Sequence, residues 1–362
     1  MLLPLASLLI FTGTYTPKDG ASRGIYALTL DPDTGKLSQP TLAAEVSAPT
    51  FLALHPNGRV LYSLAEARDA EGKSTGGAAA FALEAKTGQL TPLNLQSTGG
   101  GATTHLAVDA TGRMLITVAY GGGEVTAFPL DADGRIGPRT SVAKPQGALG
   151  PNQKRQDKPH PHSVTISPDS RFAYVCDLGL DRIFCYALDP ATATFAPAGE
   201  FATLPGAGPR HSKISVDGKF LYAINELGNT LAVYARDLTS GALTLLQSET
   251  TLPADFAGQT ITAEVRVHPN GRFVYGSNRG HDSLAVFSRH PDDGRVALIQ
   301  IIPCGGKHPR NFNLSPDGRW LICANRDTNN LTVFQVDPAT GRLTDTQQSV
   351  TVPQAVCVLF AP

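Results

Sequence analysis

Three of the segments in which basic side chains adjoin a proline could contribute to a site. These are His160-Pro161-His162, Pro209-Arg210-His211 and His308-Pro309-Arg310. Arginine binds a phosphate or a carboxylate through paired hydrogen bonds, so a site with several of these side chains would suit a small anion. Histidine exchanges protons near neutral pH, which makes His162 a candidate for acid–base catalysis.

Two glutamates occur among these basic residues. Glu226 follows Pro209-Arg210-His211 in the chain, and Glu264 is two residues before Arg266. A carboxylate can accept or donate a proton, so Glu226 joins His162 as a candidate for proton transfer. The alternative is that these charges only pair with one another, as Glu264 could with Arg266. Both interpretations stay open for a single arginine, whereas the cluster favours a functional site.

Neither a metal site nor a phosphate loop is predicted from the remaining motifs. His160 and His162 lack an obvious third ligand, and two histidines alone are a weak zinc signal. Residues 99–101 and 121–123 are glycine triplets with no helical pattern after them, which indicates turns and not phosphate loops. We therefore expect no metal and no cofactor.

A repeated unit must hold the candidate residues in place. An apolar alternating stretch, a turn of the Pro-Asn-Gly-Arg type and a second apolar stretch occur six times. Such a pattern indicates a β-hairpin, and two further strands follow in each unit. The closing basic residues are 47 to 58 residues apart, which is typical of four-stranded propeller blades with long loops. The turns are residues 55–59, 109–113, 167–171, 215–219, 268–272 and 315–319.

The two ends of the chain complement one another. Residues 8–15, 24–30 and 36–46 match the second, third and fourth strands of a unit, and residues 353–360 match a first strand. Together they would form a seventh blade that closes the ring and leaves no exposed sheet edge. We predict an all-β protein, a single seven-bladed propeller domain over residues 1–362, with four antiparallel strands per blade. Residues 1–47 and 351–362 would form the split blade, with six complete blades between them.

The predicted ring places the candidate residues on one rim. First strands line the channel of a propeller, and each starts at the face where the second strand ends. Alignment nine residues before the closing basic residue gives one column of side chains, namely Thr50, Thr104, His162, Arg210, Ala263 and Arg310, with Gln354 from the split blade. His211 and Glu264 fall in the next column, Arg266 two residues further along, and Glu226 and Arg279 at the ends of second strands. The polar stretch 144–158 is expected to be a loop over this mouth.

Composition excludes several function classes. The formal net charge of -1 gives no broad basic field, so we expect no nucleic-acid partner. Five cysteines without a C-x-x-C pair argue against a disulfide framework and against a zinc site. The apolar N-terminal run, residues 1–11, has no basic residue before it, lacks a persuasive cleavage motif and is too short to span a membrane. We expect a cytoplasmic monomer with no membrane contact, although export is not excluded.

Several phrases resemble the bacterial propeller-type 6-phosphogluconolactonases, a family related to fungal carboxymuconate-lactonizing enzymes. They are Gly208-Pro209-Arg210-His211, Ile224-Asn225-Glu226-Leu227, His162-Ser163 ahead of Ile166-Ser167-Pro168-Asp169, and His308-Pro309-Arg310-Asn311-Phe312. The resemblance extends over essentially the whole chain. It implies a metal-free hydrolysis of a small anionic sugar lactone, with 6-phospho-glucono-1,5-lactone giving 6-phosphogluconate.

The resemblance also implies roles for the rim residues. Glu226 would activate water as the base, and His162 would protonate the ring oxygen as the acid, or the two roles would be exchanged. Arg210 would polarise the carbonyl. The remaining candidates would bind substrate, with the three arginines at its anionic end; they are His160, His211, Glu264, Arg266, Arg279, His308 and Arg310.

Two other functions stay open from the sequence. A carboxymuconate-type cycloisomerase would need the same cationic mouth but no water as reactant. A non-catalytic propeller scaffold would bind a peptide or protein across its face, and it would need exposed aromatic residues on the rim. Few are predicted there beyond Tyr15, Phe51 and Tyr120.

Overall fold

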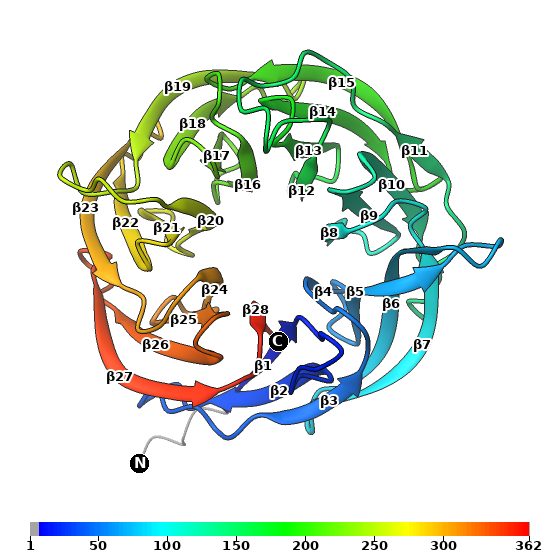
Figure 1. Cartoon of the computed structure of the whole chain (residues 1–362), viewed down its shortest axis with the longest axis horizontal. Coiled ribbons are helices and arrows are strands. Elements are labelled where there is room, and N and C mark those ends of the chain that lie inside the picture. Colours follow the sequence, from blue (N-terminus) through cyan, green and yellow to red (C-terminus); the bar gives the residue numbers. More distant parts are fainter. Residues whose placement is uncertain (1–6, 362) are drawn as a thin grey trace.

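The computed structural model describes residues 7–361 and consists of seven four-stranded antiparallel sheets arranged in a ring (Figure 1). The prediction of an all-β, seven-bladed propeller is therefore confirmed. Each blade runs outward from a first strand at the channel to a fourth strand at the circumference. Among the described residues no helix is long and apolar enough to cross a membrane.

The first blade joins the two ends of the chain, as the sequence predicted. The C-terminal strand β28 pairs with β1, and the sheet continues through β2 to β3. The apolar run of residues 1–11 lies partly outside the described residues, and its described part enters β1. The strands of this blade are β28 (Ala355–Phe360), β1 (Leu8–Thr14), β2 (Gly24–Leu30) and β3 (Thr41–Glu45).

The other six blades follow in chain order. The first three of them are β4 (Leu52–Leu54), β5 (Val60–Arg68), β6 (Ser74–Glu84) and β7 (Gln89–Ser97), then β8 (Thr103–Val108), β9 (Met114–Ala119), β10 (Glu124–Pro129) and β11 (Ser141–Ala143), then β12 (Pro161–Ile166), β13 (Phe172–Asp177), β14 (Arg182–Asp189) and β15 (Thr194–Ala202). The last three are β16 (Pro209–Ile214), β17 (Phe220–Asn225), β18 (Thr230–Arg236) and β19 (Leu243–Thr250), then β20 (Ile261–Val267), β21 (Phe273–Arg279), β22 (Ser283–Arg289) and β23 (Val296–Pro303), then β24 (Pro309–Leu314), β25 (Trp320–Asn325), β26 (Asn330–Val336) and β27 (Leu343–Thr351).

Each repeated turn of the sequence joins the first and second strands of its blade. Gly218 takes φ 74 in the fifth blade, a conformation that glycine adopts without a steric penalty. Ser170 takes the same place in the fourth blade with φ 55, where its hydroxyl accepts a hydrogen bond from Ala110 N of the preceding blade. The turns therefore form the face of the ring opposite to the predicted rim.

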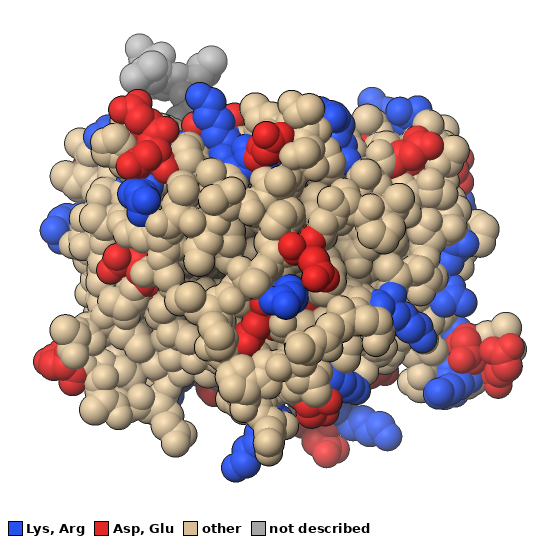
Figure 2. Space-filling model, turned by 90° about the horizontal axis from the view of Figure 1, so that it is seen from above, with Lys and Arg blue, Asp and Glu red and all other residues tan. Residues whose placement is uncertain are grey.

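In several blades a tyrosine of the second strand forms a hydrogen bond to the next blade. The buried hydroxyl of Tyr174 donates a hydrogen bond of 2.9 Å to Gly241 O, in the turn between the third and fourth strands of the following blade. Equivalent bonds are made by Tyr62, Tyr222 and Tyr275, whereas Trp320 Nε1 donates to Pro32 O across the seam to the split blade. Apolar clusters between neighbouring blades fill the rest of the core, and basic and acidic side chains are mixed over the side of the molecule in Figure 2.

Candidate functional site

A β-bulge at the start of the inner strands aims side chains at the channel. In β12 the register shifts between Pro161 and Ser163, so His162 has no pairing partner on β13. Arg210 in β16 and Arg310 in β24 occupy the same position. An unpaired residue leaves the plane of the ladder. The sequence column that joined His162, Arg210 and Arg310 thus corresponds to one structural position.

The split blade differs from the sequence alignment by two residues. The register skips Val356, not Gln354, so Val356 is the residue equivalent to Arg310. Gln354 takes φ 54 and His308 takes φ 61, which makes these two the equivalent pair before the strand. In other blades a proline directly precedes the unpaired residue, as Pro309 precedes Arg310. The sequence alignment matched Pro353 to these prolines and therefore placed Gln354 in the wrong column.

The bulged residues open onto a cavity of about 300 Å³ at this end of the channel. Its cationic and imidazole side comes from His162, Arg210, His211 and Arg310. Its opposite side is made of hydroxyl groups and one carboxylate from the earlier blades, namely Thr50, Glu66, Ser74, Thr75, Thr103 and Thr104. The cavity can therefore accept a ligand that is anionic at one end and rich in hydroxyl groups at the other.

Glu226 lies behind this cavity and is shared by three guanidinium groups. Its Oε2 accepts a hydrogen bond of 2.9 Å from Arg210 Nε and lies 2.7 Å from Arg279 Nη2. Its Oε1 accepts a hydrogen bond from Arg155 Nη2. Because one carboxylate faces three cations, the surroundings of Glu226 carry an excess of positive charge.

These neighbours decide the protonation of Glu226. Burial of the side chain alone would raise its pKa, but the attraction of Arg279 and Arg210 outweighs burial and holds the pKa well below the usual range. Burial lowers the pKa of Arg279 to about 10, so that group also stays charged at neutral pH. The pair is therefore ionised, and both oxygens of Glu226 are engaged.

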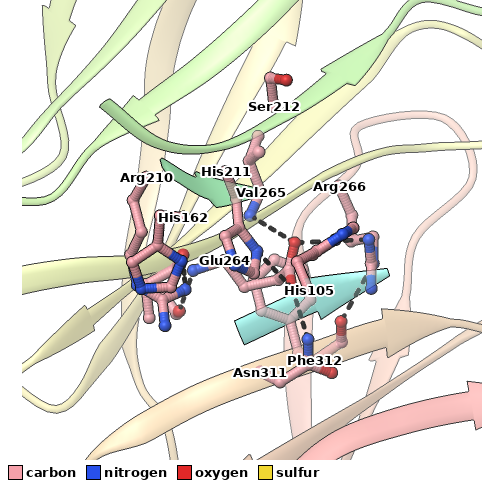
Figure 3. A network of polar contacts seen from close by, with 12 residues as sticks. His105, His162, Arg210, His211, Ser212, Glu264, Val265, Arg266, Asn311 and Phe312 are labelled. Atoms are coloured by element: carbon pink, nitrogen blue, oxygen red, sulfur yellow. Dashed lines mark hydrogen bonds and ion pairs between the residues drawn. The ribbon is translucent and has the colours of Figure 1, made fainter. Parts of the chain in front are cut away.

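A second buried carboxylate organises the layer beneath the cavity (Figure 3). Glu264 Oε2 lies 3.1 Å from His211 Nδ1 and also accepts a hydrogen bond from Asn311 Nδ2. Its Oε1 accepts a hydrogen bond of 3.0 Å from Val265 N and lies 3.3 Å from Arg266 Nη1. A carboxylate on Nδ1 fixes that nitrogen as the donor, so Nε2 of His211 is the acceptor.

Three imidazole rings are packed together between the cavity and this layer. His211 lies with its ring centroid 5.2 Å from those of both His105 and His162. Burial, followed by neighbouring charges, lowers the pKa of all three groups well below 6.5. His162 lines the cavity, and its buried Nδ1 has no hydrogen-bond partner among the described residues. His162 is therefore a neutral imidazole beside the cavity.

Six residues of the predicted site do not line this cavity. Glu226, Arg279 and Glu264 belong to the buried networks described above, and the other three lie farther away. Arg266 points to the other end of the channel, where its Nε donates to Phe312 O at 3.2 Å. His160 stacks on Tyr120 at 4.0 Å, and its two ring nitrogens contact Tyr120 O and Asp157 Oδ1. His308 Nδ1 lies 3.5 Å from Asp327 Oδ2 on the rim, and burial, then Arg279, lowers its pKa to about 3.

The sequence interpretation missed Arg155 and the part of the hydroxyl side that Ser74, Thr75 and Thr103 form. Arg155 lies in the loop of residues 144–158, and its half-exposed side chain reaches Glu226 from above the mouth. Ser74 and Thr75 begin the third strand of their blade, a position the alignment of first and second strands did not include. The one prediction that included Arg155 was that the loop of residues 144–158 lies over the mouth. Among residues 7–361, no three His, Cys, Asp or Glu side chains are grouped so that they could hold a metal ion.

Comparison with known proteins gives a consistent result. The family model for "Lactonase, 7-bladed beta-propeller" matches residues 9–360. The 6-phosphogluconolactonase of Bacillus subtilis is 37% identical over 97% of both chains. A candidate 6-phosphogluconolactonase of Bacteroides fragilis superposes with a TM-score of 0.89 over 98% of both chains at 32% identity. The periplasmic gluconolactonase of Pseudomonas aeruginosa superposes with a TM-score of 0.90 over 99% of both chains at 30% identity.

The family match covers nearly every described residue. The seven four-stranded blades of the structure also agree with the number of blades in the description of the family. The roles of the individual site residues, the monomeric state and the cytoplasmic location stay predictions. The chain belongs to the seven-bladed β-propeller lactonase family, and the protein is a lactonase.

Proposed function

We propose that the protein hydrolyses 6-phospho-glucono-1,5-lactone to 6-phosphogluconate without a metal ion. The observation that carries this proposal is Arg310. Its guanidinium lines the cavity, lies 5.5 Å from the ring centroid of Tyr15, and has no hydrogen-bond or ion-pair partner among the described residues. A half-buried cation without a partner is suited to the phosphate of the substrate. The name of the Bacillus subtilis relative agrees with that choice.

The hydroxyl side of the cavity suits the sugar ring. Thr50, Ser74, Thr75 and Thr104 offer donors and acceptors for ring hydroxyls, and Glu66 offers a carboxylate acceptor. Arg210 would act at the lactone carbonyl, because it lines the same cavity and is fixed through Glu226. A preorganised cation at the carbonyl oxygen stabilises the charge that develops in the transition state. Guanidinium groups thus supply the charge stabilisation that a metal ion supplies in other hydrolases.

The proton transfer is best assigned to His162. Glu226 is not available as a base because three guanidinium groups engage both of its oxygens and it does not line the cavity. His162 is neutral and borders the cavity, so of the two exchangeable roles from the sequence we choose His162 as the base. Glu226 then positions Arg210 and Arg279.

The proposed reaction has two steps. His162 takes a proton from water as the water oxygen bonds to the lactone carbonyl carbon, and the carbonyl oxygen gains negative charge beside Arg210. The intermediate collapses, the bond from that carbon to the ring oxygen breaks, and the imidazolium of His162 gives its proton to the ring oxygen. The product is the open hydroxy acid.

The test is the initial rate of acid release in a pH-stat, corrected for spontaneous hydrolysis. The phosphorylated lactone is compared with unphosphorylated gluconolactone, which the name of the Pseudomonas aeruginosa relative suggests as the competing substrate. Each is measured with and without EDTA. Preference for the phosphorylated lactone, unaffected by EDTA, is expected. Preference for gluconolactone would overturn the phosphate assignment, and loss of activity in EDTA would overturn the metal-free reaction.

A further inference from the structure

The channel has a second opening at the face opposite to the proposed lactone site. A cup of about 490 Å³ is formed there by the far halves of the inner strands. Its wall is mainly apolar, with Leu54, Val108, Ile166, Ile214 and Leu359 from five blades. Within residues 7–361, Phe51 alone lines both this cup and the cavity at the mouth. The two spaces are therefore separate sites.

The layer between the two cavities is closed by aromatic packing. Phe51 and His105 lie with ring centroids 3.8 Å apart, and His211 is 5.8 Å from Phe51. Glu264 lies within this layer with no exposed surface. A ligand in the cup would thus contact neither Arg210 nor His162, which line only the mouth.

Two cations face the apolar cup, and they are not equivalent. Arg266 is partly compensated, because its guanidinium lies 3.3 Å from Glu264 and donates to Phe312 O. Lys213 makes no hydrogen bond or ion pair with any described residue through its ammonium group. Burial, followed by Arg266, lowers the pKa of Lys213 to about 8, so the group is still mainly charged at neutral pH. The half-exposed ammonium group of Lys213 therefore has no counter-charge among the described residues, and a carboxylate in the cup would supply one.

Two other polar side chains of the cup, Asn313 and Thr165, are already satisfied. Asn313 Nδ2 donates to Val358 O, and its Oδ1 accepts from Leu314 N. Thr165 donates to Ser212 O at 2.7 Å. None of the described residues lining the cup is an aspartate or a glutamate. Recognition in the cup therefore depends on the two cations and on apolar contact.

We propose that this cup binds a small organic monocarboxylate, with the carboxylate between Lys213 and Arg266 and the apolar body against Leu54, Val108 and Leu359. One charge is expected because Glu264 already compensates much of Arg266, which leaves about one positive charge to be matched. An apolar body is expected because most of the side chains that line the wall are apolar. The site is independent of the proposed lactone hydrolysis.

The probe for this site is 4-bromobenzoate, titrated calorimetrically into the full-length protein. We expect one carboxylate to bind and the Lys213→Met variant to bind roughly 10- to 100-fold more weakly, as loss of a charged hydrogen bond predicts. Lys219→Met is the matched control, since this exposed lysine lies in the turn after the same strand. Arg310→Met controls for binding of the probe at the mouth, and it should leave the affinity for the cup unchanged.

A crystal of the wild-type protein soaked with 4-bromobenzoate locates the site directly. The bromine gives an anomalous peak, which we expect inside the cup with the carboxylate oriented toward Lys213. A peak only at the mouth, or no peak, overturns the proposal. Equal affinity of the wild-type and Lys213→Met proteins overturns it as well, whatever their lactonase activity.

Discussion

At the level of single residues, Glu226 holds the cationic cluster together. Arg210 and Arg279 are almost completely buried, and each would be strongly unfavourable without a counter-charge. Arg155 brings a third guanidinium group from the loop above. The carboxylate keeps these groups close to one another, and Arg310 stays free on the cavity side. The cluster can therefore receive an anion without first losing an internal ion pair.

Replacement of Glu226 by Gln tests this positioning role. The neutral amide leaves buried guanidinium groups uncompensated, so we expect the free energy of unfolding to fall by about 3–5 kcal/mol. Turnover should fall much more than substrate binding, because Arg210 loses its fixed position at the carbonyl. Urea unfolding and steady-state kinetics measure the two effects. The control is Glu200→Gln on an exposed outer strand, and an unchanged rate for Glu226→Gln contradicts the account.

The pH dependence tests the neutral state of His162. Burial, then Arg210 and His211, lowers the pKa of His162 well below 6.5. A base acts in its unprotonated form, so kcat/KM should stay constant as the pH falls through about 6.5 and should decline only at more acidic pH. The profile of kcat/KM between about pH 4 and about pH 8 measures this, after subtraction of spontaneous hydrolysis. A midpoint of kcat/KM near the ordinary histidine pKa of about 6.5 would mean that burial and the neighbouring charges do not lower the pKa of His162.

The sequence predicts some of these residues better than others. Arg210, His162 and Arg310 follow from the repeat, because each lies at a fixed distance before a recognisable turn. Arg266 is also an arginine of an inner strand, but it lies three residues beyond the column of Arg210 and Arg310, and this position carries it to the other end of the channel. Arg155 could not be predicted, because the conformation of a long loop depends on contacts that no repeat encodes.

At the level of elements, an Asp or Asn in one blade holds the loop that leads into the next. Asp181 takes φ 49 in the turn before β14, and its carboxylate accepts hydrogen bonds of 2.6 and 2.7 Å from Gly206 N and Gly208 N. Asp282 and Asn329 bind the equivalent loops through His308 N and Gln354 N. These residues tolerate a left-handed conformation and also satisfy the loop backbone. The bulge that presents Arg210 or Arg310 therefore follows a fixed loop.

Substitution of Asp181 by Ala tests this element. One buried and one partly buried N–H group lose their acceptor, and we expect a loss of about 1–3 kcal/mol in the free energy of unfolding. Because Gly208 is two residues before Arg210, a shift of this loop should also lower kcat by roughly 10-fold or more. Asp181→Asn keeps an acceptor oxygen and should recover part of both losses. Full activity and full stability of Asp181→Ala would show that the loop is held by other contacts.

At the level of the whole molecule, ring closure depends on one C-terminal strand. β28 pairs with β1, and Val358 and Phe360 pack into the apolar cluster between the last blade and the first. The split blade was predictable because the two incomplete ends complement one another as parts of one unit. The register of β28 on β1 was not predictable, because Pro353 occurs two residues before the position that the equivalent prolines take in other blades.

Removal of residues 352–362 tests the closure. The truncated chain exposes the edge of β1 and one side of an apolar cluster, so we expect loss of cooperative unfolding and the formation of aggregates. Size-exclusion chromatography and thermal unfolding measure this. A circular permutant that joins the original ends, with new ends in the exposed turn at residues 71–72, should fold normally. A truncated chain that stays monomeric with an unchanged Tm would contradict the proposed role of β28.

The most direct test of the whole account is the ratio of kcat/KM for the phosphorylated lactone to that for gluconolactone, in the wild type and in Arg310→Met. Arg319→Met, in a turn at the opposite face, is the matched control. If Arg310 binds the phosphate, its loss should lower the ratio by roughly 10- to 100-fold, the value of one or two charged hydrogen bonds. A ratio that is the same in the variant and the wild type would contradict phosphate recognition by the guanidinium cluster.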